Sequence, residues 1–280
     1  MKAFDPAIAA LAKDGARFSQ PESFQGYCER NQISAQRTAQ MISVDSLSRL
    51  SPELKAAGMM VFRLGKDRSE GTTRFGLASN VGGWKDYFID DRDVFDPSRC
   101  PITPFVPEVS NRTLFSFRLL PEFTETSFVN LAIASGALSF ALGLESKGEN
   151  SVPATGQSVF TFKFRPHRQL DTVWDHIQGQ VEIDAVFVAH RGGTPIVIVL
   201  EAKSGGLDTL AKHKLAYPVL AVRPNVPSYM DIVPVYLRAY RHGNECHFLV
   251  AECSFGPKEN EIAAISDLNV TRAVHVTFLL

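Results

Sequence analysis

Two short runs of the sequence place acidic and basic side chains at the spacing of a β-strand. Glu182 and Asp184 lie two residues apart in QVEIDAVFVAH, and Glu201 and Lys203 lie two residues apart in PIVIVLEAK. Both runs are rich in β-branched and apolar residues, which favours strands, and residues two apart in a strand point to the same face. If the two strands pair, the carboxylates and the ammonium group meet on one side of a sheet.

Carboxylates gathered in this way repel one another unless a cation lies among them. Like charges ~4 Å apart cost several kcal/mol at an effective dielectric constant of about 20. A hard divalent ion that prefers oxygen ligands, most simply Mg²⁺, would relieve the repulsion. The ammonium group of Lys203 could then stabilise negative charge on a phosphate, or orient and deprotonate a metal-bound water. These residues therefore predict the hydrolysis of phosphodiester bonds.

The same residues also have a plainer interpretation. Acidic and basic side chains at strand ends commonly form exposed ion pairs worth ~0–1 kcal/mol, and a short pattern of this kind arises by chance in many proteins. The apolar run IVIVL directly before Glu201 favours a functional site. A buried strand seldom ends in a carboxylate and a lysine without a purpose.

Further elements are expected around these strands. A long buried helix, capped by Thr124 or Thr126, is expected over residues 124–144, and a second helix over residues 207–222 should be cut by Pro218. Strands are expected at residues 158–166, 180–190, 195–203, 231–240 and 245–255.

Prolines divide the chain into two expected parts. Four of them fall in DPSRCPITPFVPEVSNR, residues 96–112, which marks a boundary. Before it, SPELKAAG predicts a helix that Ser51 caps and that ends near Gly58, followed by short strands. We therefore expect an α/β (α+β) fold, with an N-terminal α+β accessory domain for DNA recognition or regulation over residues 1–105 and a mixed β-sheet core flanked by helices over residues 106–280.

The segments EIDAVF and EAK, with sixteen residues between Asp184 and Glu201, resemble the PD-(D/E)XK nuclease superfamily, and in particular the type II restriction endonuclease-like enzymes. The resemblance covers about residues 120–255, where the expected order is helix, three strands, helix and strand. It implies that Asp184 and Glu201 are metal ligands, that the Ala202 carbonyl completes the coordination and that Lys203 is the catalytic lysine. The residue before Asp184 is isoleucine rather than proline, a departure that many members share.

The resemblance also implies site residues outside the motif. Members often supply another acidic group from the first helix, for which Glu125 is the candidate and Glu122 the second choice. Glu182 is an alternative assisting acid. Many members also place a lysine or glutamine on the second helix facing the site, where Lys214 matches in type and is preferred over Lys212.

Other basic side chains are candidates for contact with DNA phosphates. Arg165 and Arg168 lie in RPHRQ, for which a solvated turn is at least as good an interpretation. The segment FRLGKDRSEGTTRFG could approach a DNA groove or form an ordinary charged loop, and its basic residues are Arg63, Lys66, Arg68 and Arg74. The whole chain has a net charge of −1, so its composition does not itself favour nucleic acid.

Together these features predict a Mg²⁺-dependent endonuclease that cuts double-stranded DNA, most simply a sequence-specific type II restriction enzyme. Cutting both strands requires two active sites, so a homodimer is expected. The alternatives are a structure-selective or repair nuclease, a non-catalytic DNA-binding module that retains the nuclease fold, and an unrelated α/β protein with a chance motif.

The composition is that of a folded protein, with 45% hydrophobic residues among 280. No run approaches the roughly 18 apolar residues of a membrane span, and the first residues lack the apolar core of a secretion signal. We therefore expect a cytoplasmic protein without a membrane-embedded part. Its four cysteines are widely scattered, which favours reduced thiols over a disulfide framework.

Overall fold

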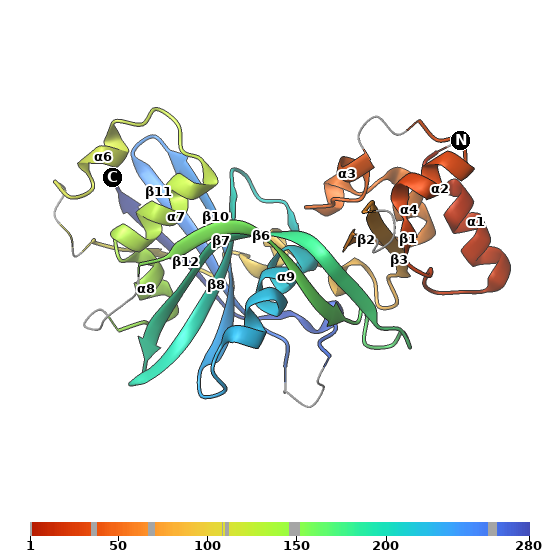
Figure 1. Cartoon of the computed structure of the whole chain (residues 1–280). Helices are drawn as coiled ribbons and strands as arrows, with labels where there is room; N and C mark the ends of the chain where they lie inside the picture. Colours follow the sequence, from red (N-terminus) through yellow and green to blue (C-terminus); the bar gives the residue numbers. More distant parts are fainter. Residues whose placement is uncertain are drawn as a thin grey trace.

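The centre of the molecule is a mixed β-sheet with helices packed against it (Figure 1). The computed structural model describes residues 2–34, 38–66, 71–107, 109, 112–145, 152–256 and 262–280. Two helices lead into three consecutive antiparallel strands: α7 (Glu125–Ala134), α8 (Ala137–Leu142), β6 (Ala154–Phe164), β7 (Trp174–Arg191) and β8 (Thr194–Ser204). After β8 the chain passes through α9 (Lys212–Val222) to β10 (Asp231–His242), which runs parallel to β8.

Further strands extend the sheet at both ends. Beyond β10 lie β11 (Glu245–Ser254), β12 (Asn269–Leu279) and β5 (Ile102–Pro104), and beyond β7 lie β2 (Met59–Lys66), β3 (Thr73–Ser79) and β1 (Glu22–Ser23). The complete order is β1-β3-β2-β7-β8-β10-β11-β12-β5, with β6 also paired to β7. A separate two-stranded ladder joins β4 (Phe88–Asp90) to β9 (Thr209–Ala211).

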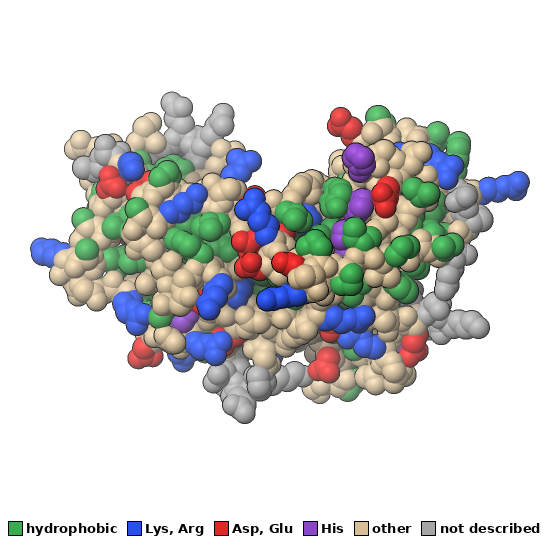
Figure 2. Space-filling model, turned by 180° about the vertical axis from the view of Figure 1, so that it is seen from behind, with side chains coloured by type: hydrophobic (Ala, Val, Ile, Leu, Met, Phe, Trp, Pro, Cys, Tyr) green, Lys and Arg blue, Asp and Glu red, His purple; other side chains and the backbone are tan. Residues whose placement is uncertain are grey.

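The remaining helices lie mostly in the N-terminal part. They are α1 (Asp5–Asp14), α2 (Phe24–Arg30), α3 (Thr38–Met41), α4 (Pro52–Ala57), α5 (Asp91–Val94) and α6 (Phe115–Arg118), with 3₁₀ turns at Leu47–Arg49, Trp84–Asp86, Arg223–Asn225 and Ile265–Asp267. Figure 1 shows α1 to α4 with β1 to β3 as one lobe and α6 to α8 on the opposite side of the molecule. In Figure 2 the surface is hollowed between the two lobes, and acidic and basic side chains gather at this waist.

The two faces of the central strands pack against different helices. Ala185 and Leu200 belong to a core shared with α7 and α8, whereas Val199 packs with Val219 of α9 on the other face. Because side chains alternate along a strand, Glu201 shares the face of Val199 and is covered by α9. The sheet thus carries Glu201 on the face opposite α7 and α8.

The expected helix over residues 124–144 is wrong in one respect, because the structure has two helices there. Thr124 caps α7 by accepting a hydrogen bond from the Ser127 N–H, and α7 ends at Ala134. Gly136 then adopts a φ of 80°, which a glycine reaches without steric cost, before α8 begins. The break turns α8 relative to α7, so that both helices can follow the surface of the sheet.

The expected start of the second helix is also wrong, and so is its expected interruption at Pro218, whereas the helix ends at Val222 as expected. Residues before Lys212 are extended, because β9 pairs with β4 and the Ala211 N–H donates to the Asp45 carbonyl. Pro218 lies inside α9 and does not end it. A proline removes one backbone donor, and here the buried residues around it hold the helix together through packing.

Most other expected elements are confirmed. The strands expected at 158–166, 180–190, 195–203, 231–240 and 245–255 appear as β6, β7, β8, β10 and β11, and the helix that ends at Gly58 is α4. Ser51 precedes α4, although its side chain makes no capping hydrogen bond. Strand β12 was not anticipated, since polar residues interrupt its apolar pattern. None of the described helices is long and apolar enough to cross a membrane.

The N-terminal elements share both sheet and core with the rest of the chain. Phe62 of β2 packs on Trp174 of β7, with 5.7 Å between ring centroids, in a core that also includes Leu215 of α9. Strand β5, just before the expected boundary at residue 105, pairs with β12. The division into domains at that residue stays a prediction.

Candidate functional site

Strands β7 and β8 separate where the acidic residues lie. Their ladder extends as far as Ala185 and Leu200, and the next position in this register sets Asp184 opposite Glu201. Directly opposed residues of antiparallel strands share a face. Beyond this point β8 remains paired only with β10, as far as Ser204.

The pairing of β7 with β6 is irregular at the same place. Gly156 pairs with Ile183, whereas Ala154 pairs with Val186, so β7 contains an extra residue next to Asp184. A bulge of this kind bends the strand and changes the direction of a side chain, and bulges are frequent at functional sites. The opening between β7 and β8 is therefore built into the backbone.

The carboxylate of Asp184 lies in this opening. Its Oδ2 accepts a hydrogen bond of 2.7 Å from the Ala202 backbone N–H. Burial raises the pKa of Asp184, while the bond from Ala202 and the charge of Lys203 act in the opposite direction. The side chain therefore links the two strands at the point where their backbone ladder has ended.

Glu201 and Lys203 form a close ion pair beside Asp184. Lys203 Nζ lies 2.9 Å from Glu201 Oε1 and donates a second hydrogen bond of 2.9 Å to the Ala202 carbonyl. Glu201 is only 3% exposed, and burial raises its pKa to about 7 although the Lys203 charge lowers it. Burial alone would lower the pKa of Lys203, but Glu201 and Glu125 together raise it above its ordinary value. Lys203 is therefore a cation, and Glu201 is close to the balance between its two protonation states at neutral pH.

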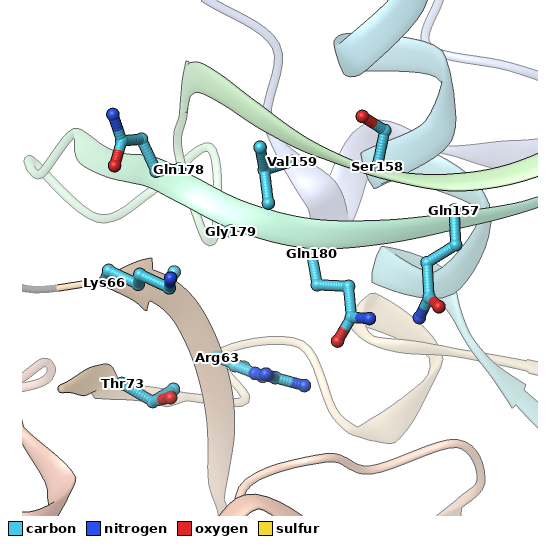
Figure 3. Close-up of a pocket in the computed structure, with 10 residues that line it drawn as sticks. Arg63, Lys66, Thr73, Gln157, Ser158, Val159, Gln178, Gly179 and Gln180 are labelled. Carbon is cyan, nitrogen blue, oxygen red and sulfur yellow. The ribbon is translucent and has the colours of Figure 1, made fainter. Parts of the chain in front are cut away.

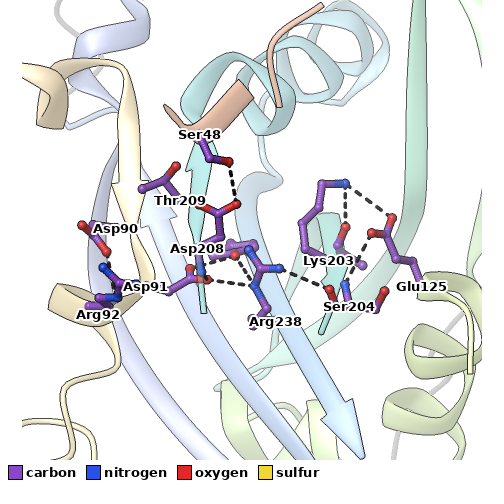
Figure 4. A network of polar contacts seen from close by, with 12 residues as sticks. Ser48, Asp90, Asp91, Arg92, Glu125, Lys203, Ser204, Asp208, Thr209 and Arg238 are labelled. Carbon is purple, nitrogen blue, oxygen red and sulfur yellow. Dashed lines mark hydrogen bonds and ion pairs between the residues drawn. The ribbon is translucent and has the colours of Figure 1, made fainter. Parts of the chain in front are cut away.

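The first turn of α7 contributes one more acidic side chain. Glu125 Oε2 lies 3.4 Å from Lys203 Nζ, and its Oε1 accepts a hydrogen bond from the Ser204 N–H at 3.4 Å (Figure 4). The structure thus brings Glu125 to the site, as the resemblance implied. Glu182 is exposed on β7, two residues before Asp184, and its charge raises the pKa of Asp184.

Of the two lysines on α9, Lys214 is the one that acts on the site. Its charge lowers the pKa of Glu201, and its Nζ forms an ion pair with Asp45 at 3.1 Å. Lys212 instead donates to the Ser266 carbonyl at 3.4 Å, and burial lowers its pKa to about 8. Asp45 was not anticipated, because nothing in its local sequence marks it as a partner for α9.

The site contains a small set of oxygen ligands. In the part of the chain that the structure describes, no three Asp, Glu, His or Cys side chains are grouped so as to hold a metal ion. The available oxygens are those of Asp184, Glu201 and the Ala202 carbonyl, and the Lys203 ammonium contacts the last two. Any metal bound here would depend on two carboxylates and a backbone carbonyl.

The basic residues proposed for DNA contact lie away from these carboxylates. Arg165 follows the Phe164–Trp174 pair, at the opposite end of β7 from Asp184, and Arg168 forms an ion pair with Asp267 at 2.7 Å. Arg74 donates to the Pro21 carbonyl at 3.2 Å. Arg68 lies outside the residues that the structure describes.

A buried network that the sequence did not reveal supports the end of β8. Arg238 of β10 is the register partner of Lys203, and its guanidinium donates to Asp91 Oδ2 at 2.8 Å and to the Ser204 carbonyl at 3.4 Å (Figure 4). Asp91 also accepts a hydrogen bond from the Tyr236 hydroxyl at 2.8 Å. The sequence feature that could have revealed this network is the charged Arg238 within the apolar run VYLRAY. This network connects α5 in the N-terminal part to the backbone that follows Lys203.

Comparisons with known proteins identify the family. The family model described as "Domain of unknown function (DUF6997)" matches residues 107–270, a range that contains Glu125, Asp184, Glu201 and Lys203. No curated protein and no solved structure matches the chain. Because the matched range is more than half of the chain, the protein belongs to the DUF6997 family.

Proposed function

We propose that the protein is a Mg²⁺-dependent endonuclease that hydrolyses phosphodiester bonds in double-stranded DNA, of the restriction endonuclease-like kind. One observation carries the proposal: Asp184, Glu201 and Lys203 lie together at the opening between β7 and β8. Lys203 Nζ is 2.9 Å from Glu201 Oε1. Asp184 Oδ2 is 2.7 Å from the backbone N of Ala202, the residue between Glu201 and Lys203. The spacing in the sequence and the position in space thus agree.

The order and direction of the elements support the same proposal. Helices α7 and α8 precede three antiparallel strands, and α9 then crosses to β10, which is parallel to β8. The PD-(D/E)XK resemblance implies this order, with the acidic residues on the second and third strands and the lysine two residues after the second acid. A chance match of the short motif would not require this arrangement around it.

The oxygens of the site suit a hard divalent cation. Glu201 Oε1 and the Ala202 carbonyl already converge on one positive charge, the Lys203 ammonium. Carboxylate and carbonyl oxygens are the ligands that Mg²⁺ prefers. Asp184 and Glu201 would hold the ion, with the Ala202 carbonyl as a third ligand. A bound Mg²⁺ would supply an activated water and would neutralise charge on the phosphate.

The protein side chains have distinct roles in this proposal. With Asp184 and Glu201 holding such an ion, the Lys203 ammonium would serve a phosphate or the attacking water. Glu125 Oε2 lies 3.4 Å from Lys203 Nζ and would help to position that group. Lys214 adds positive charge on the α9 side, which favours the ionised form of Glu201.

Cleavage of unmethylated plasmid DNA with and without Mg²⁺ tests the proposal. We expect Asp184→Asn and Lys203→Ala each to reduce the cleavage rate by ~10³-fold or more, because each removes charge stabilisation that water cannot replace. Matched controls come from the exposed pair Lys163 and Asp175, whose charged atoms lie 3.9 Å apart on the β6–β7 hairpin. Lys163→Ala and Asp175→Asn should cleave at the wild-type rate.

Thermal unfolding gives a second measurement that does not depend on turnover. Mg²⁺ should raise the Tm of the wild-type protein by a few degrees, since a ligand at about 100 times its Kd stabilises by ~2.7 kcal/mol, and Asp184→Asn should abolish the shift.

In the cleavage assay, discrete DNA fragments would support a sequence-specific enzyme, whereas a smear would support a structure-selective or repair nuclease. Wild-type protein that neither cuts DNA nor responds to Mg²⁺ would overturn the proposal.

A further inference from the structure

A pocket of about 360 Å³ lies between the N-terminal lobe and the β6–β7 hairpin. We call it the interlobe pocket, and its polar lining includes Arg63, Lys66, Gln157, Ser158, Gln178 and Gln180. In Figure 3 the side chains of Gln157 and Gln180 extend from the hairpin toward Arg63 on β2. Two parts of the chain that are distant in sequence therefore form its opposite walls.

Two glycines allow these walls to meet. β2 contacts β7 where Gly65 pairs with Ile177, and Gly65 has a φ of 82°. A Cβ atom on Gly65 would lie 2.2 Å from the Ile177 carbonyl oxygen, and one on Gly179 would lie 2.7 Å from the Cα of Gly65. Both distances are impossible for real Cβ atoms, so the crossing of β2 over β7 requires glycine at both positions.

The pocket carries positive charge and amide groups. Of its described lining residues none is a carboxylate, whereas Arg63 and Lys66 are cations. Among the residues that the structure describes, no ion pair or side-chain hydrogen bond engages either of these two side chains. Glutamine amides can both donate and accept hydrogen bonds, as the edges of nucleic acid bases require, and arginine and lysine contact phosphates.

Strand β7 connects the pocket directly to the candidate site. Burial alternates along β7 from Gly179 to Ile183, so Gln180 and Glu182 lie on one side of it. The extra residue next to Asp184 then turns that side chain into the opening between β7 and β8. Four residues of extended strand span about 13 Å, which is about four base-pair steps of 3.4 Å. A DNA strand with its scissile phosphate at Asp184 would therefore place neighbouring nucleotides at the pocket.

We propose that the interlobe pocket binds the DNA duplex about four base pairs from the cleavage position, a proposal that rests on the nuclease function proposed above. Arg63 and Lys66 contact phosphates, and Gln157 and Gln180 contact base edges. The pocket thus gives the N-terminal lobe a role in holding the substrate.

Binding to a labelled DNA duplex, without divalent metal and over a range of salt concentrations, tests this role. Each phosphate contact that is lost should reduce the slope of log K against log salt by about 0.9. Lys66 is exposed, so Lys66→Glu should leave the fold intact, weaken binding about tenfold and lower the slope by about one. Arg63→Ala with Lys66→Ala should lower it by about two. The charge-matched control is Lys13→Ala with Arg17→Ala, two exposed residues of the same lobe outside the pocket, and it should bind as wild type does.

The glutamines require a different measurement. Gln180→Ala should leave the salt slope unchanged and alter the preference among duplexes of different sequence, because a lost base contact costs about 1–3 kcal/mol at one position, or roughly 5-fold to 150-fold.

Binding and cleavage can fail separately. Pocket variants that bind DNA as the wild-type protein does, or a preference of the wild-type protein for an RNA duplex, would overturn the pocket proposal even if DNA is cut. Pocket-dependent DNA binding without cleavage would support the pocket and contradict the nuclease function.

Discussion

Two carboxylate–cation pairs lie at neighbouring positions of strands β8 and β10. Lys203 pairs with Glu201 of the same strand, and its register partner Arg238 pairs with Asp91 of α5. Each pair joins a carboxylate to a cationic side chain, and both are largely buried. They differ in how completely their hydrogen-bonding atoms are used.

Asp91 has partners on both oxygens. Oδ1 accepts from the Tyr236 hydroxyl at 2.8 Å, and Oδ2 accepts from Arg238 at 2.8 Å and from the Asp208 backbone N–H at 3.0 Å. Burial raises the pKa of Asp91, but Arg238 and these hydrogen bonds oppose the shift. Such a closed network has no capacity for another ligand, and its role is to hold α5, β10 and the end of β8 together.

The pair at the candidate site is open by comparison. Asp184 accepts one hydrogen bond, and Lys203 is shared among Glu201, Glu125 and the Ala202 carbonyl. Glu201 and Glu125 contact the ammonium group, and Asp184 lies close enough to raise its pKa. A buried ion pair whose hydrogen-bonding atoms are all used holds elements together, whereas one with unused atoms leaves room for another ligand.

The largest expected effect on stability comes from breaking the closed network. Asp91→Ala leaves Arg238 buried without its carboxylate, and we expect the free energy of unfolding to fall by about 3–5 kcal/mol in urea denaturation. Asp93 lies exposed on the same short helix, and Asp93→Ala should change stability by less than about 0.5 kcal/mol. Equal losses for the two variants would contradict the special position of Asp91.

At the candidate site, the stability contributed by Glu201 should instead depend on pH. Burial raises the pKa of Glu201 from 4.5 to about 7, so the folded protein binds this proton more tightly than the unfolded chain does. The resulting stabilisation is complete below about pH 4.5 and is lost as the pH rises through about 7. Without divalent metal, the stability of the wild-type protein relative to Glu201→Gln should fall by about 2–3 kcal/mol between about pH 5 and pH 8.

Unfolding measured across this pH range checks the expectation. Lys163→Ala, at an exposed residue of the β6–β7 hairpin outside the site, serves as the control. If the difference in the free energy of unfolding between Glu201→Gln and wild type does not change with pH, the contrast between this pair and the Asp91 network is wrong.

The smallest effect on stability is expected for an exposed carboxylate–cation pair. Lys163 and Asp175 lie 3.9 Å apart, with 65% and 49% of their side chains exposed. Lys163→Ala should change the free energy of unfolding by about 0.5 kcal/mol or less, because water and salt screen the interaction. A loss comparable to that of Asp91→Ala would show that burial does not explain the contrast between these pairs.

The sequence predicted much of the candidate site because its signals were local. Alternation in β7 and β8 placed Asp184 and Glu201 on strands, and their short connection made antiparallel pairing the simplest arrangement. Glu125 was proposed only because the resemblance implies an acidic group on the first helix, and the Thr124 cap places it in the first turn of α7.

What the sequence missed depends on contacts between distant segments. The β4–β9 ladder displaced the start of α9, and the Asp45–Lys214 and Asp91–Arg238 pairs join residues far apart in the chain. The crossing of Gly65 over Gly179 is equally invisible locally, since a glycine in a strand can mark a bulge, a bend or a close approach. Local propensity cannot choose among these alternatives.

Strand β7 joins the interlobe pocket to Asp184 without an intervening loop. From Gly179 to Ile183 the strand is regular, and the bulge at Asp184 then turns the carboxylate toward Glu201 and Lys203. The distance between the pocket that would bind a polymer and the site that would cut it is therefore set by a short length of extended backbone.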